Sequence, residues 1–293
     1  MSTVTPTNPQ APVPPELVCP GCLGNLEARG EVSPGALPHL GCTTCERTYS
    51  AEAGYVDFIG LTGDADSGVQ GLGPRLMHSR ALAGVYEKLW RPFFVAVASG
   101  RRPDYADELG HILHTLEPAR DGVIADISCG PGFTGRHLAG TQRFARVYGV
   151  DWSVPMLRQA LAARDPALAL LRADVVRLPF ARESLAGLHA GAALHVWPDP
   201  QSAIAEAARV LRPGGVFVAS TFAHLPGAPL RPVAGGFQAI SSARVFEADE
   251  LAGMCRAHGL LDFTPERRGA LIMFSATRGH AVTPISTGKP GRA

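Results

Sequence analysis

The sequence predicts an α/β protein with a doubly wound, mostly parallel sheet, preceded by a small cysteine-bearing segment. From about residue 120 onward, short apolar runs typical of buried strands alternate with segments of helical periodicity. That alternation is typical of consecutive βαβ units, which build parallel sheets covered by helices on both faces. Near the N-terminus, two Cys-x2-Cys pairs are separated by 19 residues, a spacing typical of a metal-bound ribbon.

The apolar runs and helical segments define the predicted elements in order. A helical stripe over 76–98, interrupted at Pro92, and a second helix over about 104–117 precede the first strand. The predicted strands then cover about 122–127, 144–150, 167–172, 185–190, 214–222 and 270–276. The predicted helices between them cover about 133–140, 154–163, 200–211 and 247–258.

Composition divides the 293 residues into one large domain and a small appendage. Residues 1–15 are proline-rich and predicted to be disordered, and 16–59 form the cysteine ribbon. The glycine-rich stretch 60–74 is predicted to be a linker. The remaining domain, 75–279, begins with cap helices and contains a Gly- and Pro-bearing lid at 223–245, followed by a flexible tail at 280–293.

Charge and hydropathy exclude several classes of protein. Charged residues are 18% and hydrophobic residues 46%, as in a globular domain with a sizeable core. A net charge of +1 gives no general attraction to nucleic acid. No apolar run is long enough for a membrane span, and the N-terminus lacks the pattern of a signal peptide. We therefore expect a cytoplasmic protein, whose oligomeric state the sequence leaves open.

The two cysteine pairs predict a structural metal site. In a reducing compartment, paired cysteines indicate metal binding rather than disulfides. Four thiolates close a tetrahedral zinc site without a position for substrate, so the ion would stabilise a segment too small to fold alone. A redox pair or an iron site is the remaining alternative. The predicted ligands are Cys19, Cys22, Cys42 and Cys45.

The stretch 123–135, V-I-A-D-I-S-C-G-P-G-F-T-G, predicts a ligand site between a strand and a helix. Asp126 ends the apolar run, and Gly130 and Gly132 form the turn. Nineteen residues past Gly132, Asp151 stands where a βαβ unit binds a ribose diol. One acid suited to an ammonium and another suited to a ribose together indicate S-adenosylmethionine. The alternatives are a dinucleotide fingerprint, in which Asp126 would repel the pyrophosphate, and a plain tight turn.

Residues after each later strand extend this predicted cofactor site. Trp152 and Met156 could sandwich the adenine, although core packing is the alternative. Asp174 could accept from the adenine amino group, with the Val175 N–H serving a ring nitrogen, or Asp174 could instead cap a helix. Small side chains after the fourth strand would leave room for the methionine chain. Ser128 in the turn and Gly191 complete the set.

The sequence offers fewer candidates for catalysis and for binding a substrate than for binding the cofactor. His195 is the first candidate general base and His189 the second, because histidine titrates near neutral pH; ordinary packing or hydrogen bonding is the alternative for both. Aromatic residues on the 76–98 stripe could cap the pocket over a flat, apolar substrate, or could be core. These are Tyr86, Trp90 and Phe93.

The motifs A-D-I-S-C-G-P-G, G-V-D-W-S-V-P-M-L and R-V-L-R-P-G-G, over about 120–222, resemble those of class I S-adenosylmethionine-dependent methyltransferases. The cysteine segment, Y-E-K-L-W-R-P-F-F, H-A-G-A-A-L-H-V-W-P-D-P and I-M-F-S-A are similar to the zinc-ribbon methyltransferases of plant plastids and cyanobacteria. The resemblance implies a Rossmann-like methyltransferase sheet with an N-terminal zinc ribbon. Without a clear transit peptide, a bacterial, cytosolic version is expected.

The ribbon and Y-S-A-E-A-G-Y-V-D-F-I also resemble the start of the 23S rRNA guanine-N1 methyltransferases. In that family the fourth zinc ligand is usually histidine, whereas here it is Cys45. Two arginines against five glutamates make the ribbon a poor phosphate-binding face. We therefore expect methyl transfer to a small, aromatic or apolar metabolite on O, C or N. The alternatives are an rRNA or tRNA base methyltransferase, and a cofactor-binding protein of this fold without methyl transfer, such as a cyclase or partner-binding module.

Overall fold

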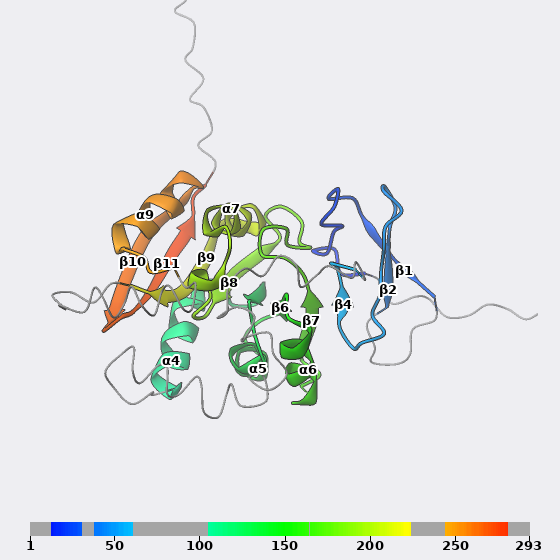
Figure 1. Ribbon diagram of the computed structural model, residues 1–293, viewed down its shortest axis with the longest axis horizontal. Coiled ribbons are helices and arrows are strands. Elements are labelled where there is room, and N and C mark those ends of the chain that lie inside the picture. Colours follow the sequence, from blue (N-terminus) through cyan, green and yellow to red (C-terminus); the bar gives the residue numbers. More distant parts are fainter. Residues whose placement is uncertain (1–12, 31–37, 61–104, 164, 224–243, 281–293) are drawn as a thin grey trace, which may run out of the picture.

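The computed structural model describes residues 13–30, 38–60, 105–163, 165–223 and 244–280 (Figure 1). The predicted helical stripe over 76–98 and most of the predicted linker, lid and tail lie outside the described residues. Within the described ranges, no helix is long and apolar enough to cross a membrane.

The centre of the molecule is an eight-stranded sheet in the order β10-β11-β9-β8-β5-β6-β7-β4 (Figure 1). Among the strands that the structure describes, β11 alone has the reversed direction, pairing antiparallel with β9 and β10, and the other pairs are parallel. The predicted doubly wound, mostly parallel sheet is thereby confirmed. The strands are β4 (Val56–Asp57), β5 (Val123–Ile127), β6 (Arg146–Asp151), β7 (Leu168–Arg172), β8 (Leu185–Ala190), β9 (Leu211–Phe222), β10 (Leu260–Arg268) and β11 (Leu271–Arg278).

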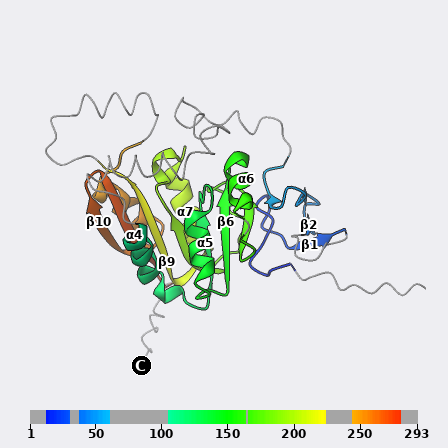
Figure 2. The ribbon, with the colours of Figure 1, turned by 90° about the horizontal axis from the view of Figure 1, so that it is seen from below.

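Helices cover both faces of this sheet (Figures 1 and 2). The helices α4 (Tyr105–Thr115), α5 (Phe133–Gly140) and α6 (Val154–Ala162) lie on one face, and α7 (Pro200–Val210) and α9 (Ala248–Ala257) on the other. Side-chain caps start two of them: the Ser153 hydroxyl accepts from the Met156 N–H, and Asp199 accepts from the Ser202 N–H. Short 3₁₀ turns follow α4 (Glu117–Ala119) and β8 (Leu194–Val196).

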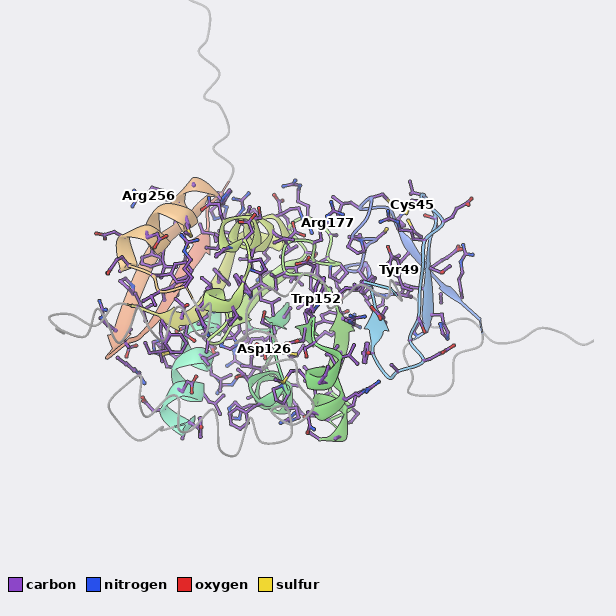
Figure 3. All side chains as sticks on the ribbon, viewed as in Figure 1. Cys45, Tyr49, Asp126, Trp152, Arg177 and Arg256 are labelled. Carbon is purple, nitrogen blue, oxygen red and sulfur yellow. The ribbon has the colours of Figure 1, made fainter. Side chains whose placement is uncertain are left out.

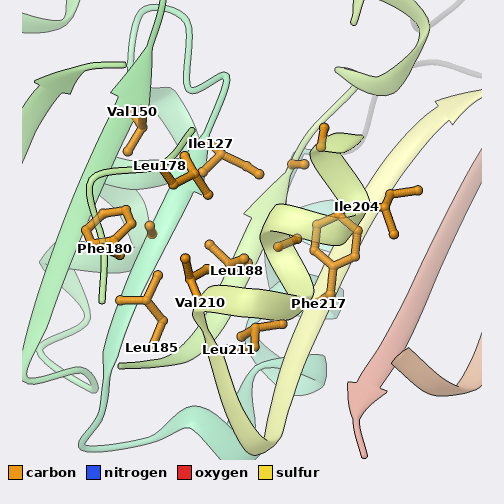
Figure 4. Packing of buried hydrophobic residues seen from close by; sticks show 14 of the residues in the cluster. Ile127, Val150, Leu178, Phe180, Leu185, Leu188, Ile204, Val210, Leu211 and Phe217 are labelled. Atoms are coloured by element: carbon orange, nitrogen blue, oxygen red, sulfur yellow. The ribbon is translucent and has the colours of Figure 1, made fainter. Parts of the chain in front are cut away.

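Alternation along the strands divides the core into two layers. In β9, Val216 and Val218 belong to the cluster under α4, α5 and α6, whereas Phe217 and Ala219 belong to the cluster under α7 and α9. Figure 4 shows part of this second cluster, in which Phe217, Ile204 and Leu188 are labelled. Successive strand side chains point to opposite faces, so strands covered on both sides read as continuous apolar runs.

The cysteine ribbon is joined to this sheet. Its own sheet, β1 (Leu26–Arg29), β2 (His39–Cys42) and β3 (Thr48–Tyr49), is antiparallel. The chain then pairs as β4 with β7, in parallel, so β4 forms one edge of the large sheet. Leu17, Cys19 and Phe58 belong to the same apolar cluster as the central strands. The ribbon and the large domain therefore share a core.

Two strand predictions need correction. The strand β10 was not predicted, because its side chains are mostly exposed, it contains Pro265, and it lies at the sheet edge where neither feature is costly. The strand β9 begins at Leu211 rather than at 214, since its R-P-G-G stretch continues the strand through a register shift opposite β8. The other predicted strands and helices among the described residues are confirmed to within one to two residues at most ends.

Candidate active site and cysteine cluster

The glycine turn after β5 has a left-handed backbone at three positions. Ser128, Gly130 and Gly132 have φ angles of 57°, 55° and 79°. Such angles disfavour a Cβ, which explains the two glycines of the motif. Gly132 directly precedes α5, so the turn connects the end of β5 to the N-terminus of a helix.

Asp151 connects this turn to the next one. Its carboxylate accepts from the Gly130 N–H and from the Ser153 N–H, each at 2.7 Å, one on each oxygen. The residue is 9% exposed, and this burial raises the pKa of the carboxyl to about 6, partly offset by the two N–H donors. Each oxygen keeps acceptor capacity beyond its backbone bond, so the group can still receive ligand hydroxyls.

Asp126 and His189 form a buried pair on adjacent strands, β5 and β8. The His189 Nδ1 lies 2.7 Å from an Asp126 oxygen, and the exposed fractions are 4% and 2%. An ionised carboxylate only accepts, so Nδ1 carries the proton and Nε2 of a neutral ring is left as an acceptor. The second Asp126 oxygen has no hydrogen-bond partner among the described residues. A buried acceptor of this kind suits a cationic ligand group.

The remaining predicted cofactor residues lie after the same strands. Trp152, which Figure 3 labels, is partly exposed, and Met156 is buried at the start of α6. Asp174 and Val175 are partly buried after β7, where Asp174 accepts from the Val176 N–H in a tight turn rather than in a helix cap. At Gly191 an added Cβ would lie 2.8 Å from the His189 ring, so glycine leaves that ring its space.

The two histidines have different environments. His195, in the 3₁₀ turn after β8, is 7% exposed and packs edge-on against Phe222 with ring centroids 4.3 Å apart. Its Nδ1 has no hydrogen-bond partner among the described residues, and burial lowers its pKa to about 3. A ring with that pKa is a weak proton acceptor, whereas His189 is oriented by a carboxylate.

One contact in the turn was not anticipated. The Trp197 indole N–H donates to the Ser128 hydroxyl at 2.9 Å, which joins the end of the β8 loop to the glycine turn. The only sequence signal is the tryptophan in H-V-W-P-D-P, since indole N–H groups usually find a partner when buried. Tyr86, Trp90 and Phe93, the predicted acceptor-binding residues, lie outside the described residues.

The four ribbon cysteines converge on one point. All four sulfurs lie within 4.8 Å of one another, with Cys19–Cys45 at 3.6 Å and Cys22–Cys42 at 3.5 Å. A tetrahedral zinc site with metal–sulfur bonds of about 2.3 Å has sulfur–sulfur edges of about 3.8 Å. The Cys45 and Thr44 N–H groups donate to the Cys42 sulfur. These hydrogen bonds, most of all the one from Cys45, lower the pKa of the Cys42 thiol to about 6. The donor set therefore fits a tetrahedral metal ion.

The other two cysteines are not in this cluster. Cys129 in the glycine turn is 9% exposed, and burial raises the pKa of its thiol well above the ordinary value. Burial in α9 likewise raises the pKa of Cys255, to about 12. Both side chains remain neutral thiols at physiological pH and pack as small apolar groups.

The strand order, the glycine turn and the acids at the ends of β5 and β6 define a class I methyltransferase fold. The family described as "Methyltransferase domain" matches residues 125–219. Two uncharacterized chloroplastic methyltransferases of Arabidopsis thaliana are each 35% identical to the chain, over 89% of its length and 78% and 77% of theirs. The chain belongs to the class I S-adenosylmethionine-dependent methyltransferases.

Other relatives share only part of the chain. The demethylmenaquinone methyltransferase of Thermobifida fusca is 29% identical over 54% of this chain and 60% of its own. Among solved structures, phosphoethanolamine N-methyltransferase 2 of Haemonchus contortus with S-adenosyl-L-methionine superimposes with a TM-score of 0.58 at 15% identity. That match covers 70% of this chain and 59% of the other, and it supports the fold alone.

The first prediction concerns pH. Because the pKa of Asp151 is raised to about 6, its carboxylate becomes protonated below that pH, and affinity for S-adenosylmethionine should fall as pH drops through this value. Asp126 and Cys129 are the neighbouring titratable groups. Calorimetric titrations at about pH 5 and about pH 7.5 should show affinity up to roughly tenfold weaker at the lower pH in the wild type, the most that one group with this pKa can give. Asp151→Asn should bind weakly with little of this dependence; an equally steep profile in that variant would assign the titration to another group.

Proposed function

We propose that this methyltransferase transfers the methyl group to a small, apolar or aromatic metabolite, with His189 as the general base. The observation that carries the proposal is the His189–Asp126 pair at the carboxyl edge of the sheet, next to the turn that Asp151 holds. Ligands of open α/β sheets bind at this edge.

The residues fit S-adenosylmethionine as follows. The Asp126 oxygen that has no hydrogen-bond partner among the described residues would accept from the ammonium, and Asp151 would accept from the ribose hydroxyls. Trp152, Met156, Asp174 and Val175 would surround the adenine, with Gly130, Gly132 and Ser128 giving close backbone approach and Gly191 leaving space. The cofactor supplies an electrophilic methyl group on a sulfonium.

His189 would then take the acceptor proton. Its Nε2 would accept the O–H, N–H or acidic C–H proton, leaving the acceptor atom the electron pair with which it would take the methyl group that the sulfonium supplies. Asp126 holds Nδ1–H and stabilises the imidazolium that results. The pair is buried, so water is excluded from the proton transfer.

A small acceptor is supported by charge and by relatives. The net charge is +1, and the ribbon carries more acids than arginines, which is unfavourable for a nucleic-acid backbone. The partial relatives include enzymes named for demethylmenaquinone and malonyl-[acyl-carrier protein]. The test is release of S-adenosylhomocysteine with a panel of quinones, phenols and fatty-acyl thioesters against total rRNA. Turnover with rRNA alone, or S-adenosylmethionine binding with no acceptor turned over, would contradict the proposal.

Substitution at Asp151 tests the cofactor assignment. Asp151→Ala should weaken S-adenosylmethionine binding by roughly tenfold or more, because it removes a charge-assisted acceptor of two hydroxyls. Isothermal titration measures this, and NADH serves as the control ligand that no variant should bind. An unchanged dissociation constant would remove Asp151 from the ribose site.

Substitution of the two histidines tests the base. His189→Gln should lower kcat by roughly 10²-fold with a smaller effect on cofactor affinity, the loss typical of a missing general base. His195→Gln, at the buried ring beside Phe222, should lower kcat far less. A larger loss of kcat in the His195 variant would reverse the assignment.

We infer that the ribbon holds a structural zinc ion on Cys19, Cys22, Cys42 and Cys45. The wild type should contain about one zinc ion per chain, and Cys42→Ser should contain clearly less. The same variant should lower Tm by roughly 5 °C or more. Because the ribbon shares the core of the sheet, thermal unfolding should remain a single transition. Cys255→Ala, a buried cysteine outside the cluster, should retain full zinc by elemental analysis. Wild-type protein with no zinc after purification without chelator would refute the assignment.

A further inference from the structure

Arg172, the last residue of β7, contacts both the ribbon and the cofactor edge. Its Nη1 donates to a carboxylate oxygen of Asp57 in the ribbon at 3.0 Å. Its Nε donates to the Trp152 carbonyl at 3.1 Å. The arginine is 7% exposed, so a buried guanidinium connects two segments that are far apart in the sequence. Figure 3 places Trp152 between Asp126 and the ribbon's Tyr49 in that view.

Asp57 is itself fixed by the ribbon. It pairs with Arg172 in the β4–β7 register, and the next residue, Phe58, donates its N–H to the Arg172 carbonyl at 2.8 Å. The carboxylate oxygen that does not face Arg172 accepts from the Ile59 and Gly60 N–H groups at 3.0 and 3.1 Å. Both oxygens of Asp57 are therefore occupied, and the side chain has a defined orientation.

On its other side, Arg172 contacts the loop after β6. The Trp152 carbonyl lies between Asp151 and Ser153, whose N–H donates to the Asp151 carboxylate. The Asp151 carbonyl in turn accepts from the Ala173 N–H, the residue after Arg172. The Trp152 carbonyl and the Ser153 N–H belong to the same peptide group, so Arg172 binds the peptide that also binds the Asp151 carboxylate, which accepts from Gly130.

We propose that the ribbon positions the nucleoside half of the cofactor site, through the Asp57–Arg172–Trp152 bridge. The inference rests on the proposed function in that it takes Asp151 and Trp152 as ribose and adenine contacts. Arg172 and Asp57 are positioning residues, since neither is required to touch the cofactor. A planar guanidinium can serve two acceptors at once, which a lysine ammonium on a flexible stem does less well.

The ribbon offers a matched control in a second attachment. Glu16 accepts from Arg146 Nη1 at 2.6 Å and from the Tyr148 hydroxyl at 2.8 Å. The side chains of Glu16 and Asp57 are 7% and 15% exposed, whereas those of their arginine partners, Arg146 and Arg172, are 43% and 9% exposed. Arg146 starts β6, whereas Asp151 ends it, so this contact lies at the opposite end of the strand from the cofactor edge.

The experiment compares Asp57→Asn, Arg172→Lys, the double variant and Glu16→Gln in the full chain. Isothermal titration should show S-adenosylmethionine affinity roughly five- to tenfold weaker in each Asp57 or Arg172 variant, with the double variant little weaker than either single one. Glu16→Gln should lower Tm comparably yet change affinity less than about twofold. Hydrogen exchange of the 151–156 segment should rise in the first three variants only.

Two outcomes would overturn the ribbon's role. One is unchanged affinity in Asp57→Asn and Arg172→Lys. The other is an equal loss of affinity in Glu16→Gln at an equal loss of Tm, which would mean that the ribbon acts only through stability. Both are separable from failure of the cofactor assignment, which would instead appear as no S-adenosylmethionine binding by the wild type or no effect of Asp151→Ala.

Discussion

The cofactor edge depends on the carboxylate of Asp151. Its two oxygens bind the N–H groups of Gly130 and Ser153, which belong to the turns after neighbouring strands. Burying a charged group is costly, and the raised pKa of Asp151 records that cost. The two backbone donors offset part of it while they fix the distance between the turns. A cofactor that contacts both turns therefore binds a site whose backbone is already ordered. Less of its binding free energy is then used to order the two turns.

The ribbon extends this assembled edge by another strand. Because β4 pairs with β7, the ribbon covers an edge that would otherwise present unpaired N–H and C=O groups. Two of its cysteines, Cys19 and Cys42, belong to the same apolar cluster as the central strands, so the cysteine cluster and the sheet stabilise each other. A small segment with a shared core can transmit strain to the sheet, which an independently folded appendage on a flexible linker could not do.

Local sequence patterns predicted the elements whose signals are local. The glycine turn follows a strand, and Asp126 and Asp151 lie at the ends of neighbouring strands, as the left-handed turn and the βαβ spacing predicted. The strand β10 was missed because its exposed, polar pattern lacks an apolar run. The contacts of His189 with Asp126, and of Arg172 with Asp57, depend on which strands become neighbours. That pairing is a tertiary property, so no spacing in the chain could reveal these contacts.

The strand order also determines which end of the site the ribbon can influence. Along the edge β8-β5-β6-β7-β4, the order of groups is His189, Asp126, Asp151, Arg172 and Asp57. With strands about 4.8 Å apart, four steps separate His189 from Asp57 by roughly 19 Å. The proposed methyl-transfer end thus lies far from the ribbon, while the proposed ribose acid is two steps away. A ribbon at this position is poorly placed to contact the acceptor but well placed to hold the loop that follows β6. Its influence should therefore fall on cofactor affinity rather than on proton transfer.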